Sequence, residues 1–306
     1  YTKSNTTVQF NISKANSTVT GAIANITYGN NTIVIVNVSG VNGTDLSGNV
    51  TVTINGVSRN GTVNSTGMGK VIMPIFAVGN YNATIVYYGN DNYTAANATV
   101  KFRVVKGNAT VTGTIANIIY GENATVKVNV TGVNSEGLNG NVTVTVDNKN
   151  YTVNLTNGIG SLIVPSLSTG NYTAEIKFMG NDNYTESEVV LVNFTVFKAN
   201  STVTIHVDRL YNDENNTGNI TLNGANNMPL NGTVHVMINS TLLDVPVEFN
   251  VTVVNGKGTY TNRVFTNGNY TATATFNGDS NHNMSVGVYN FEVMPLVAYV
   301  FSENIT

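Results

Sequence analysis

The sequence predicts an all-β protein made of consecutive β-sandwich domains arranged as an elongated rod. Three observations lead to this fold class: one segment recurs at a spacing of 92 residues, apolar and polar residues alternate within each copy, and helical periodicity is absent. Of the 306 residues, 41% are hydrophobic, so the chain can bury several separate cores. We therefore expect a tandem array of small domains.

The repeat begins at a lysine in each of its three copies. The segment Lys14-Ala-Asn-Ser-Thr-Val-Thr20 returns as Lys106-Gly-Asn-Ala-Thr-Val-Thr112 and as Lys198-Ala-Asn-Ser-Thr-Val-Thr204. This spacing of 92 residues suits a small β-domain. The predicted domains are residues 14–105, 106–197 and a divergent third at 198–295, with flanking segments at 1–13 and 296–306.

Alternation with a period of two indicates half-buried strands within each repeat. In Val142-Thr-Val-Thr-Val146 the valines share one face and the threonines share the other. Asn/Gly turns such as Thr156-Asn-Gly158 separate these segments. The strands predicted for the second repeat are 108–115, 123–130, 141–147, 150–155, 159–164, 171–179 and 188–197. Seven short antiparallel strands in a repeat of this length predict an immunoglobulin-like sandwich.

A tyrosine in each repeat supports that sandwich. Immunoglobulin-like domains place a tyrosine near the start of the sixth strand, two residues before a core position, with its hydroxyl bonded back to the backbone. The motif Gly-Asn-Tyr-x-Ala fits this tyrosine corner at Tyr81, Tyr172 and Tyr270, followed by Ala83, Ala174 and Ala272. The alternative is that each tyrosine is only an amphipathic residue at a strand end.

The junctions between repeats contain almost no linker. From Phe102 to Val111 the last strand of one repeat runs into the first strand of the next, without a Pro-rich or Gly/Ser-rich segment. Short junctions restrict bending, so we expect a rod to which each repeat adds roughly 40 Å.

The two flanking segments resemble parts of a repeat. Tyr1 to Lys14 aligns with Tyr93 to Lys106, so residues 1–13 are expected to be the last strand of a preceding repeat, or a donor strand that pairs with a neighbouring molecule. Residues 296–306 are expected to start a following segment.

Composition excludes several classes of protein. The 14 basic and 17 acidic side chains, with a net charge of −3, argue against a nucleic-acid partner. The absence of cysteine excludes disulfides and thiolate metal sites. No apolar run approaches the length of about 18 residues that a membrane helix needs, so no membrane insertion is expected. No catalytic constellation or phosphate loop is present, so we expect neither an enzyme nor a cofactor.

Asn-x-Ser/Thr sequons occur about 31 times, where chance placement would give roughly ten. One interpretation is N-glycosylation of an exported protein. The other is that Asn and Thr on the outward face of a strand lie two residues apart, so that the motif arises from strand periodicity alone. Sequons at turns are the better candidates for glycans, and those predicted are Asn60, Asn92, Asn183 and Asn215.

Metal sites are not expected from the titratable residues. His206, His235 and His282 all lie in the third repeat without ligand spacing, and solvent exposure is the simpler interpretation. Asp91 and Asp182 each offer a single carboxylate in a Gly-Asn-Asp-Asn-Tyr loop, which a tight turn explains without calcium.

Lysine and tyrosine residues offer two further types of chemistry, cross-linking and sugar binding. The recurring Lys14, Lys106 and Lys198 are candidates for isopeptide cross-links, although junction lysines are expected to be exposed. Exposed tyrosines such as Tyr88, Tyr93 and Tyr184 could stack on sugars, although tryptophan, the usual platform, is missing.

The segment Gly170-Asn-Tyr-Thr-Ala, continuing through Phe178-Met-Gly-Asn-Asp-Asn-Tyr-Thr185 to Val192-Asn-Phe-Thr-Val196, resembles a known class of repeat. It is similar to the tandem bacterial immunoglobulin-like (Big-type) repeats of adhesin-like surface proteins, particularly those of methanogenic archaea. The likeness is weakest between residues 205 and 265. It implies cell-surface display, adhesion or a wall-associated structure, and glycosylation, and it carries over no catalytic residue.

The sequence therefore favours a non-enzymatic, extracellular, rigid stalk or adhesin-like array at the cell surface. Its expected partners are neighbouring copies, other cell-surface components or glycans. The alternative is a subunit of a polymeric filament or sheath in which residues 1–13 complement a neighbour. A carbohydrate-binding module is the third interpretation.

Overall fold

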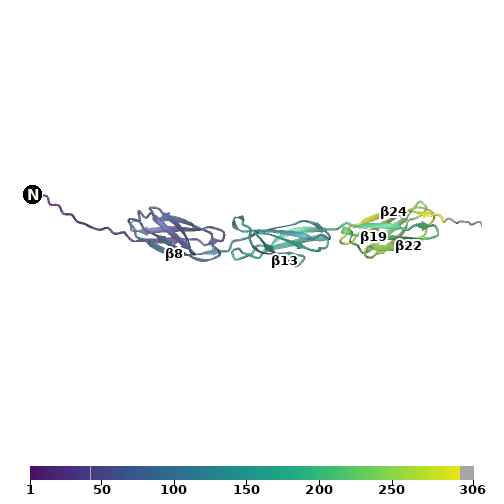
Figure 1. Ribbon diagram of the computed structural model, residues 1–306, viewed down its shortest axis with the longest axis horizontal. Coiled ribbons are helices and arrows are strands. Elements are labelled where there is room, and N and C mark those ends of the chain that lie inside the picture. The colour runs from purple at the N-terminus through teal and green to yellow at the C-terminus, as the bar shows by residue number, and fades with distance from the viewer. Residues whose placement is uncertain (42, 297–306) are drawn as a thin grey trace, which may run out of the picture. The chain divides into compact units, whose positions relative to one another are not determined.

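The computed structural model describes residues 1–41 and 43–296, which form an all-β chain with 24 strands in those residues (Figure 1). The strands fall into three groups, β1–β8, β9–β16 and β17–β24, and no sheet of the described chain mixes two groups. The chain also divides into two compact units that do not follow the repeats: Tyr1–Thr114, Lys127–Leu162 and Glu175–Val192 form one, and Ile115–Val126, Ile163–Ala174 and the residues from Asn193 onward form the other.

The first repeat is a single curled sheet. Its strands are β1 (Ser17–Ala22), β2 (Ile26–Thr27), β3 (Thr32–Gly40), β4 (Gly48–Ile54), β5 (Val57–Val63), β6 (Met68–Met73), β7 (Gly79–Tyr87) and β8 (Ala96–Val105). Their order in the sheet is β1-β3-β6-β5-β4-β7-β8-β2. One residue pair, Val63 opposite Gly69, joins β5 to β6. This pair connects the strands β1-β3-β6 to the strands β5-β4-β7-β8-β2 in one sheet.

The second repeat contains all seven predicted strands within two residues at each end. They are β9 (Thr110–Ile115), β11 (Ala124–Thr131), β12 (Gly140–Val146), β13 (Lys149–Leu155), β14 (Ile159–Val164), β15 (Gly170–Phe178) and β16 (Val190–Phe197). A 3-10 turn, η1 (Val133–Ser135), follows β11. The sheets run β14-β11-β9 and β10-β16-β15-β12-β13, which confirms an immunoglobulin-like sandwich.

The third repeat has the same two sheets. Its strands are β17 (Thr202–Val207), β18 (Leu210–Tyr211), β19 (Asn215–Asn223), β20 (Gly232–Asn239), β21 (Val247–Val253), β22 (Lys257–Val264), β23 (Gly268–Phe276) and β24 (Ser285–Met294), with η2 at Ala225–Asn227. One sheet runs β17-β19-β22 and the other β18-β24-β23-β20-β21. The divergent sequence of this repeat therefore keeps the common fold.

Each repeat holds an eighth strand, so the predicted count of seven was too low. The extra strands are β2, β10 (Ile118–Ile119) and β18, and each pairs in parallel with the last strand of its repeat. The side chain of Asn25 or Asn117 accepts a hydrogen bond from the backbone of that last strand in the first two repeats. A strand of two residues is too short to show any periodicity, which is why the sequence did not reveal it.

Alternation along the strands builds the cores. In β3 the side chains of Val34, Val36 and Val38 are buried, whereas Ile33 and Ile35 face outward. The alanines two residues after the corner tyrosines, Ala83, Ala174 and Ala272, are all 0% exposed. Valine is the most frequent buried residue in these cores, as expected for a side chain that packs well on a pleated sheet.

Threonine and asparagine side chains pair across neighbouring strands on the outer faces. In each pair the Thr hydroxyl donates to the Asn amide oxygen, at 2.8–2.9 Å. The pairs are Thr51–Asn60, Thr145–Asn150, Thr173–Asn193, Thr195–Asn171 and Thr271–Asn290. Mid-strand sequons therefore have a structural role that does not require a glycan.

Residues 1–13 form no strand with the rest of the described chain. Their alternating apolar side chains are exposed, with Val8 at 75%, Phe10 at 78% and Ile12 at 87%. Pairing with another molecule therefore stays a prediction. The segment predicted to start at residue 296 lies, apart from Leu296, outside the described residues.

The three corner tyrosines make the same hydrogen bond. The hydroxyls of Tyr81, Tyr172 and Tyr270 each donate to the carbonyl four residues earlier, all at 2.9 Å. Each ring also stacks on a phenylalanine of the last strand. The tyrosine thus fixes the turn before the sixth main strand to the strand itself.

Replacing Tyr172 with Phe should lower the free energy of unfolding by about 1 kcal/mol, because the carbonyl of Ser168 loses its donor while ring packing is kept. Denaturant unfolding of the full chain measures this change. Tyr88→Phe, at a tyrosine 60% exposed, is the control and should leave the midpoint unchanged. An equal effect of the two substitutions would contradict the corner.

Replacing Asn216 with Ala should stabilise the third repeat by about 1 kcal/mol. The Asn216 side chain is 0% exposed, and neither polar atom has a hydrogen-bond partner in the described structure. A buried amide without partners is destabilising, and the second repeat carries Ala124 at the same register. Thermal unfolding would measure the gain, with Asn219→Ala, exposed on the same strand, as control. A lower unfolding temperature for Asn216→Ala would show that its amide is satisfied.

Candidate functional site: the loop at the head of each repeat

A short loop at one end of each repeat is held by a network of hydrogen bonds. We call it the head loop and define it as residues 89–93, 180–184 and 278–282. Its second residue closes it: a side-chain oxygen of Asn90, Asn181 or Asp279 accepts hydrogen bonds from two backbone N–H groups, at 2.7–3.0 Å. The glycine that begins each loop has φ between +76° and +82°, which other residues rarely adopt.

The head loop clamps the chain where it enters the repeat. Gly107 donates its N–H to the carbonyl of Asn183 and accepts from Thr185, at 3.0 and 2.9 Å. Ala15 and Ala199 make the same two bonds in the first and third repeats. The residue after the junction lysine is therefore a fixed part of its own repeat and not a flexible link.

The junction lysines contact the loop rather than an asparagine side chain. Lys106 Nζ donates to the carbonyl oxygen of Asn181 at 2.6 Å, and Lys198 Nζ to that of Asp279 at 2.5 Å. Both lysines are exposed. A backbone carbonyl cannot form an isopeptide, so this arrangement gives the proposed cross-link no support.

The last residue of each loop is an aromatic ring packed over a glycine. Tyr93, Tyr184 and His282 are all buried, and a Cβ at Gly40, Gly132 or Gly224 would come within 2.3–2.8 Å of the respective ring. The Tyr184 hydroxyl donates to Glu136. Burial, as the larger cause, and this hydrogen bond together raise the pKa of Tyr184 to about 12. Tyr93 donates to the carbonyl of Val41 at 2.6 Å.

Their burial corrects two sequence interpretations. Tyr93 and Tyr184 cannot act as sugar platforms, because their rings fill the space over a glycine; of the three tyrosines considered, Tyr88 alone is exposed. His282 was expected in solvent, but it is 7% exposed, with Nδ1 3.0 Å from the carboxylate of Asp279. The sequence did not reveal this, because loop residues are usually exposed.

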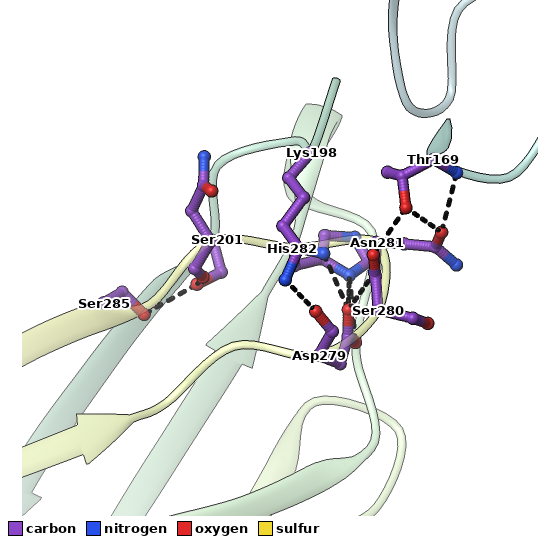
Figure 2. Close-up of polar contacts among 9 residues, drawn as sticks. Thr169, Lys198, Ser201, Asp279, Ser280, Asn281, His282 and Ser285 are labelled. Carbon is purple, nitrogen blue, oxygen red and sulfur yellow. Dashed lines mark hydrogen bonds and ion pairs between the residues drawn. The ribbon is translucent and has the colours of Figure 1, made fainter. Parts of the chain in front are cut away.

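The head loops also contact a group of residues in the repeat before them, which we call its tail. The tail includes Tyr28, Gly29 and Val78 in the first repeat and Tyr120, Gly121 and Thr169 in the second. The N–H of Val78 donates to the side-chain oxygen of Asn183 at 3.2 Å, and the N–H of Thr169 to that of Asn281 at 3.1 Å. Figure 2 shows the second case, in which the Thr169 hydroxyl also reaches the carbonyl of Ser280 at 2.6 Å. Each of these contacts lies within one compact unit.

One pair of aromatic rings adds to the contact at each junction. Tyr28 meets Tyr184 edge to face at 5.3 Å, and Tyr120 meets His282 in the same way at 5.4 Å. Tyr28 and Tyr120 occupy equivalent positions, each followed by glycine. Sequence reasoning missed this pair, although the recurrence of Tyr-Gly at the repeat spacing was a visible signal.

The predicted glycan sites differ in accessibility. Asn92 is exposed in the first head loop, whereas Asn183 is half-buried and its side-chain oxygen accepts from Val78. Asn60 and Asn215 were predicted at turns, but they lie on strands β5 and β19. The turn signal at Asn60 was misleading because Asn60-Gly61 belongs to a strand whose outward Asn pairs with Thr51.

No group of three or more potential metal ligands occurs in the described residues. Asp91 and Asp182 are exposed, and Asp279, not either of these, shares a hydrogen bond with a histidine. His206 is exposed against Tyr289, and His235 lies 3.5 Å from Glu248. No helix of the described chain has the length and apolarity needed to cross a bilayer.

Comparison with known proteins finds only distant structural likenesses. No protein-family model and no curated protein matches the sequence. Among solved structures, invasin, a bacterial integrin-binding protein, is similar at a TM-score of 0.48 and 16% identity, and the match covers 91% of this chain and 60% of that one. Titin domains A168–A170 match at 0.40 and 13% over 93% and 100% of the two chains. A 1.5-MDa bacterial ice-binding adhesin matches at 0.34 and 16% over 92% and 99%.

The Asp279 loop should make stability depend on pH. Burial raises the pKa of Asp279, but hydrogen bonds from the backbone of Asn281 and from His282 lower it more, so it lies below its usual 3.8. A depressed pKa means that the carboxylate stabilises the fold above about pH 4 and that this stabilisation is lost as the pH falls through the folded-state pKa.

Asp279→Asn keeps the acceptor oxygen used by Asn90 and Asn181 but removes the titration. The excess unfolding temperature of the wild type over this variant should shrink as the pH falls from about 5 to about 2.5. Asp91→Asn, at an exposed carboxylate, is the control. A difference that stays constant over this range would contradict the prediction.

Proposed function

We propose that this chain is a stretch of a non-enzymatic, extracellular stalk that displays an adhesive or contact region at a cell surface. The sandwiches serve as spacers, and the head loops keep successive sandwiches from bending freely. The proposal includes the resemblance to Big-type repeats of adhesin-like archaeal surface proteins, which neither the fold nor the comparisons establish.

One observation carries the proposal. Both junctions use corresponding parts: the entering residue held by two backbone bonds, the Asn side chain that accepts a tail N–H, and the edge-to-face aromatic pair. Four residues separate β8 from β9, at 106–109, and four separate β16 from β17, at 198–201. A linker that served free motion would not be tied down in this way.

The surface chemistry supports an extracellular setting. Charged residues make up 10% of the chain, and the outer strands carry Thr–Asn pairs in their place. We infer that glycans on exposed sequons add to this neutral polar layer. Asn60 and Asn215 are exposed, and a sugar there would not meet a head loop.

A second candidate function, polymerisation by strand exchange, rests on the exposed apolar side chains of residues 1–13. Each described repeat already contains its own last strand, β8, β16 or β24. A donated strand would therefore have to add at a sheet edge instead of filling a gap.

Spin-label distances across both junctions of the full chain test the stalk, since the absence of cysteine allows specific labelling. We expect narrow distance distributions and, by solution scattering, a maximum dimension near 120 Å, about 40 Å per repeat, that does not change with concentration. Tyr120→Asn with Gly121→Asp should broaden the second distribution only, and Tyr88→Asn should broaden neither. Broad wild-type distributions would contradict the stalk, and growth with concentration would favour polymerisation.

A further inference from the structure

The head of the first repeat has the parts that bind a tail at the other two heads. Asn92 and Tyr93 correspond to Asn183 and Tyr184, and Val41 corresponds to Val133. The loop is closed in the same way, by the side chain of Asn90. A hollow of about 340 Å³ lies at this head, lined by Val41, Asn92 and Tyr93 among others.

The exposure of Val41 and Asn92 shows that nothing in the described chain covers these two residues. Val41 is 63% exposed and Asn92 is exposed, whereas Val133 and Asn183, which contact the tail of the first repeat, are half-buried. Within residues 1–41 and 43–296, the side-chain oxygen of Asn92 accepts no hydrogen bond. The first head therefore presents, in open form, the surface that is covered at the other two.

We propose that the first head is a docking site for the tail of a repeat that carries a Tyr-Gly pair there, as the tails of the first and second repeats do. This inference rests on the proposed function, because it assumes that head-to-tail contact holds repeats in line. The docking tail would place its tyrosine edge against Tyr93 and donate a backbone N–H to Asn92. Its glycine would lie against Val41, as Gly29 lies against Val133.

The third repeat cannot supply that tail. Asn212 and Asp213 stand where the other repeats have Tyr-Gly, and the Asn212 side chain accepts instead from the N–H of Leu296 at 3.2 Å. Gly29 has a φ of +93°, and a Cβ there would come within 2.7 Å of Val133, so Asp at that position would be strained and crowded.

Charge acts in the same direction. Asp45, Asp91 and Lys14 line the first head, and the third tail carries Asp213 where the Tyr-Gly tails have a glycine. Docking of a second copy through its third repeat would bring these carboxylates together and leave the aromatic pair incomplete. The occupant is therefore a Tyr-Gly tail and not the tail of the third repeat.

Two four-repeat chains test the proposal. In one, residues 14–105 are joined to residue 14 of the chain, which offers a Tyr-Gly tail to the first head. In the other, residues 198–295 are joined at the same point and offer the Asn-Asp tail. Fusion raises the effective concentration of the tail to the millimolar range, so a weak contact is still detected.

Spin labels across the new junction should give a narrow distance distribution with the Tyr-Gly tail and a broad one with the Asn-Asp tail. In the added Tyr-Gly repeat, hydrogen exchange at the amide of Val78 should be about tenfold slower than in the same fusion with Asn92→Ala, for a hydrogen bond worth about 1.4 kcal/mol. Matching unfolding midpoints would show that all repeats are folded in each fusion.

Equal widths for the two tails, or no effect of Asn92→Ala, would overturn the docking site. A glycan on Asn92 in the native protein would also overturn it, because the sugar would fill the position of the tail. Labels across the chain's own second junction separate the two proposals: if that junction is narrow and the new one broad, only the docking site fails. If both are broad, the stalk fails with it.

Discussion

The ends of the repeats depend on one acceptor, the side-chain oxygen of Asn90, Asn181 or Asp279. By accepting two backbone N–H groups it closes the head loop without help from a neighbouring strand. The closed loop then presents one carbonyl and one N–H to the entering chain and holds an aromatic ring over a glycine. The same residue also donates its backbone N–H to the carbonyl of the aromatic residue that ends the loop, so one position per repeat makes three of the bonds that close the loop.

Replacing the amide by a carboxylate alters only part of this arrangement in the third repeat. Asp279 accepts the same backbone bonds as Asn181, but it also pairs with the ring of His282, which replaces Tyr184. The edge-to-face contact with the preceding tyrosine survives the change of ring. Divergence in the third repeat thus preserves the contacts of the junction while it places a titratable carboxylate in the head loop.

The outer faces explain how a chain with so few charges keeps a polar surface. Thr hydroxyls and Asn amides satisfy each other across strands, and each Asn retains an NH₂ group for water. Asn171-Tyr-Thr173 and Asn193-Phe-Thr195 form two such pairs between neighbouring strands, so both sequons take part in the sheet surface. The excess of sequons in the sequence is in part a record of this pairing.

The sequence by itself determined the repeat, its strands and its outward polar faces, because these depend on periodicities of 2 and 92 residues that can be read directly along the chain. It did not reveal the short strands β2, β10 and β18, which are below the length at which alternation can be seen.

Only the tertiary structure decided that Tyr93, Tyr184 and His282 are buried, that the junction lysines bond to backbone carbonyls, and that Tyr28 and Tyr120 meet the next head loop. The lysine and aromatic contacts join residues 75 or more positions apart, and each buried ring lies more than 50 positions from its glycine. Their distances depend on how the closed loop aims each side chain, which local sequence preference does not specify.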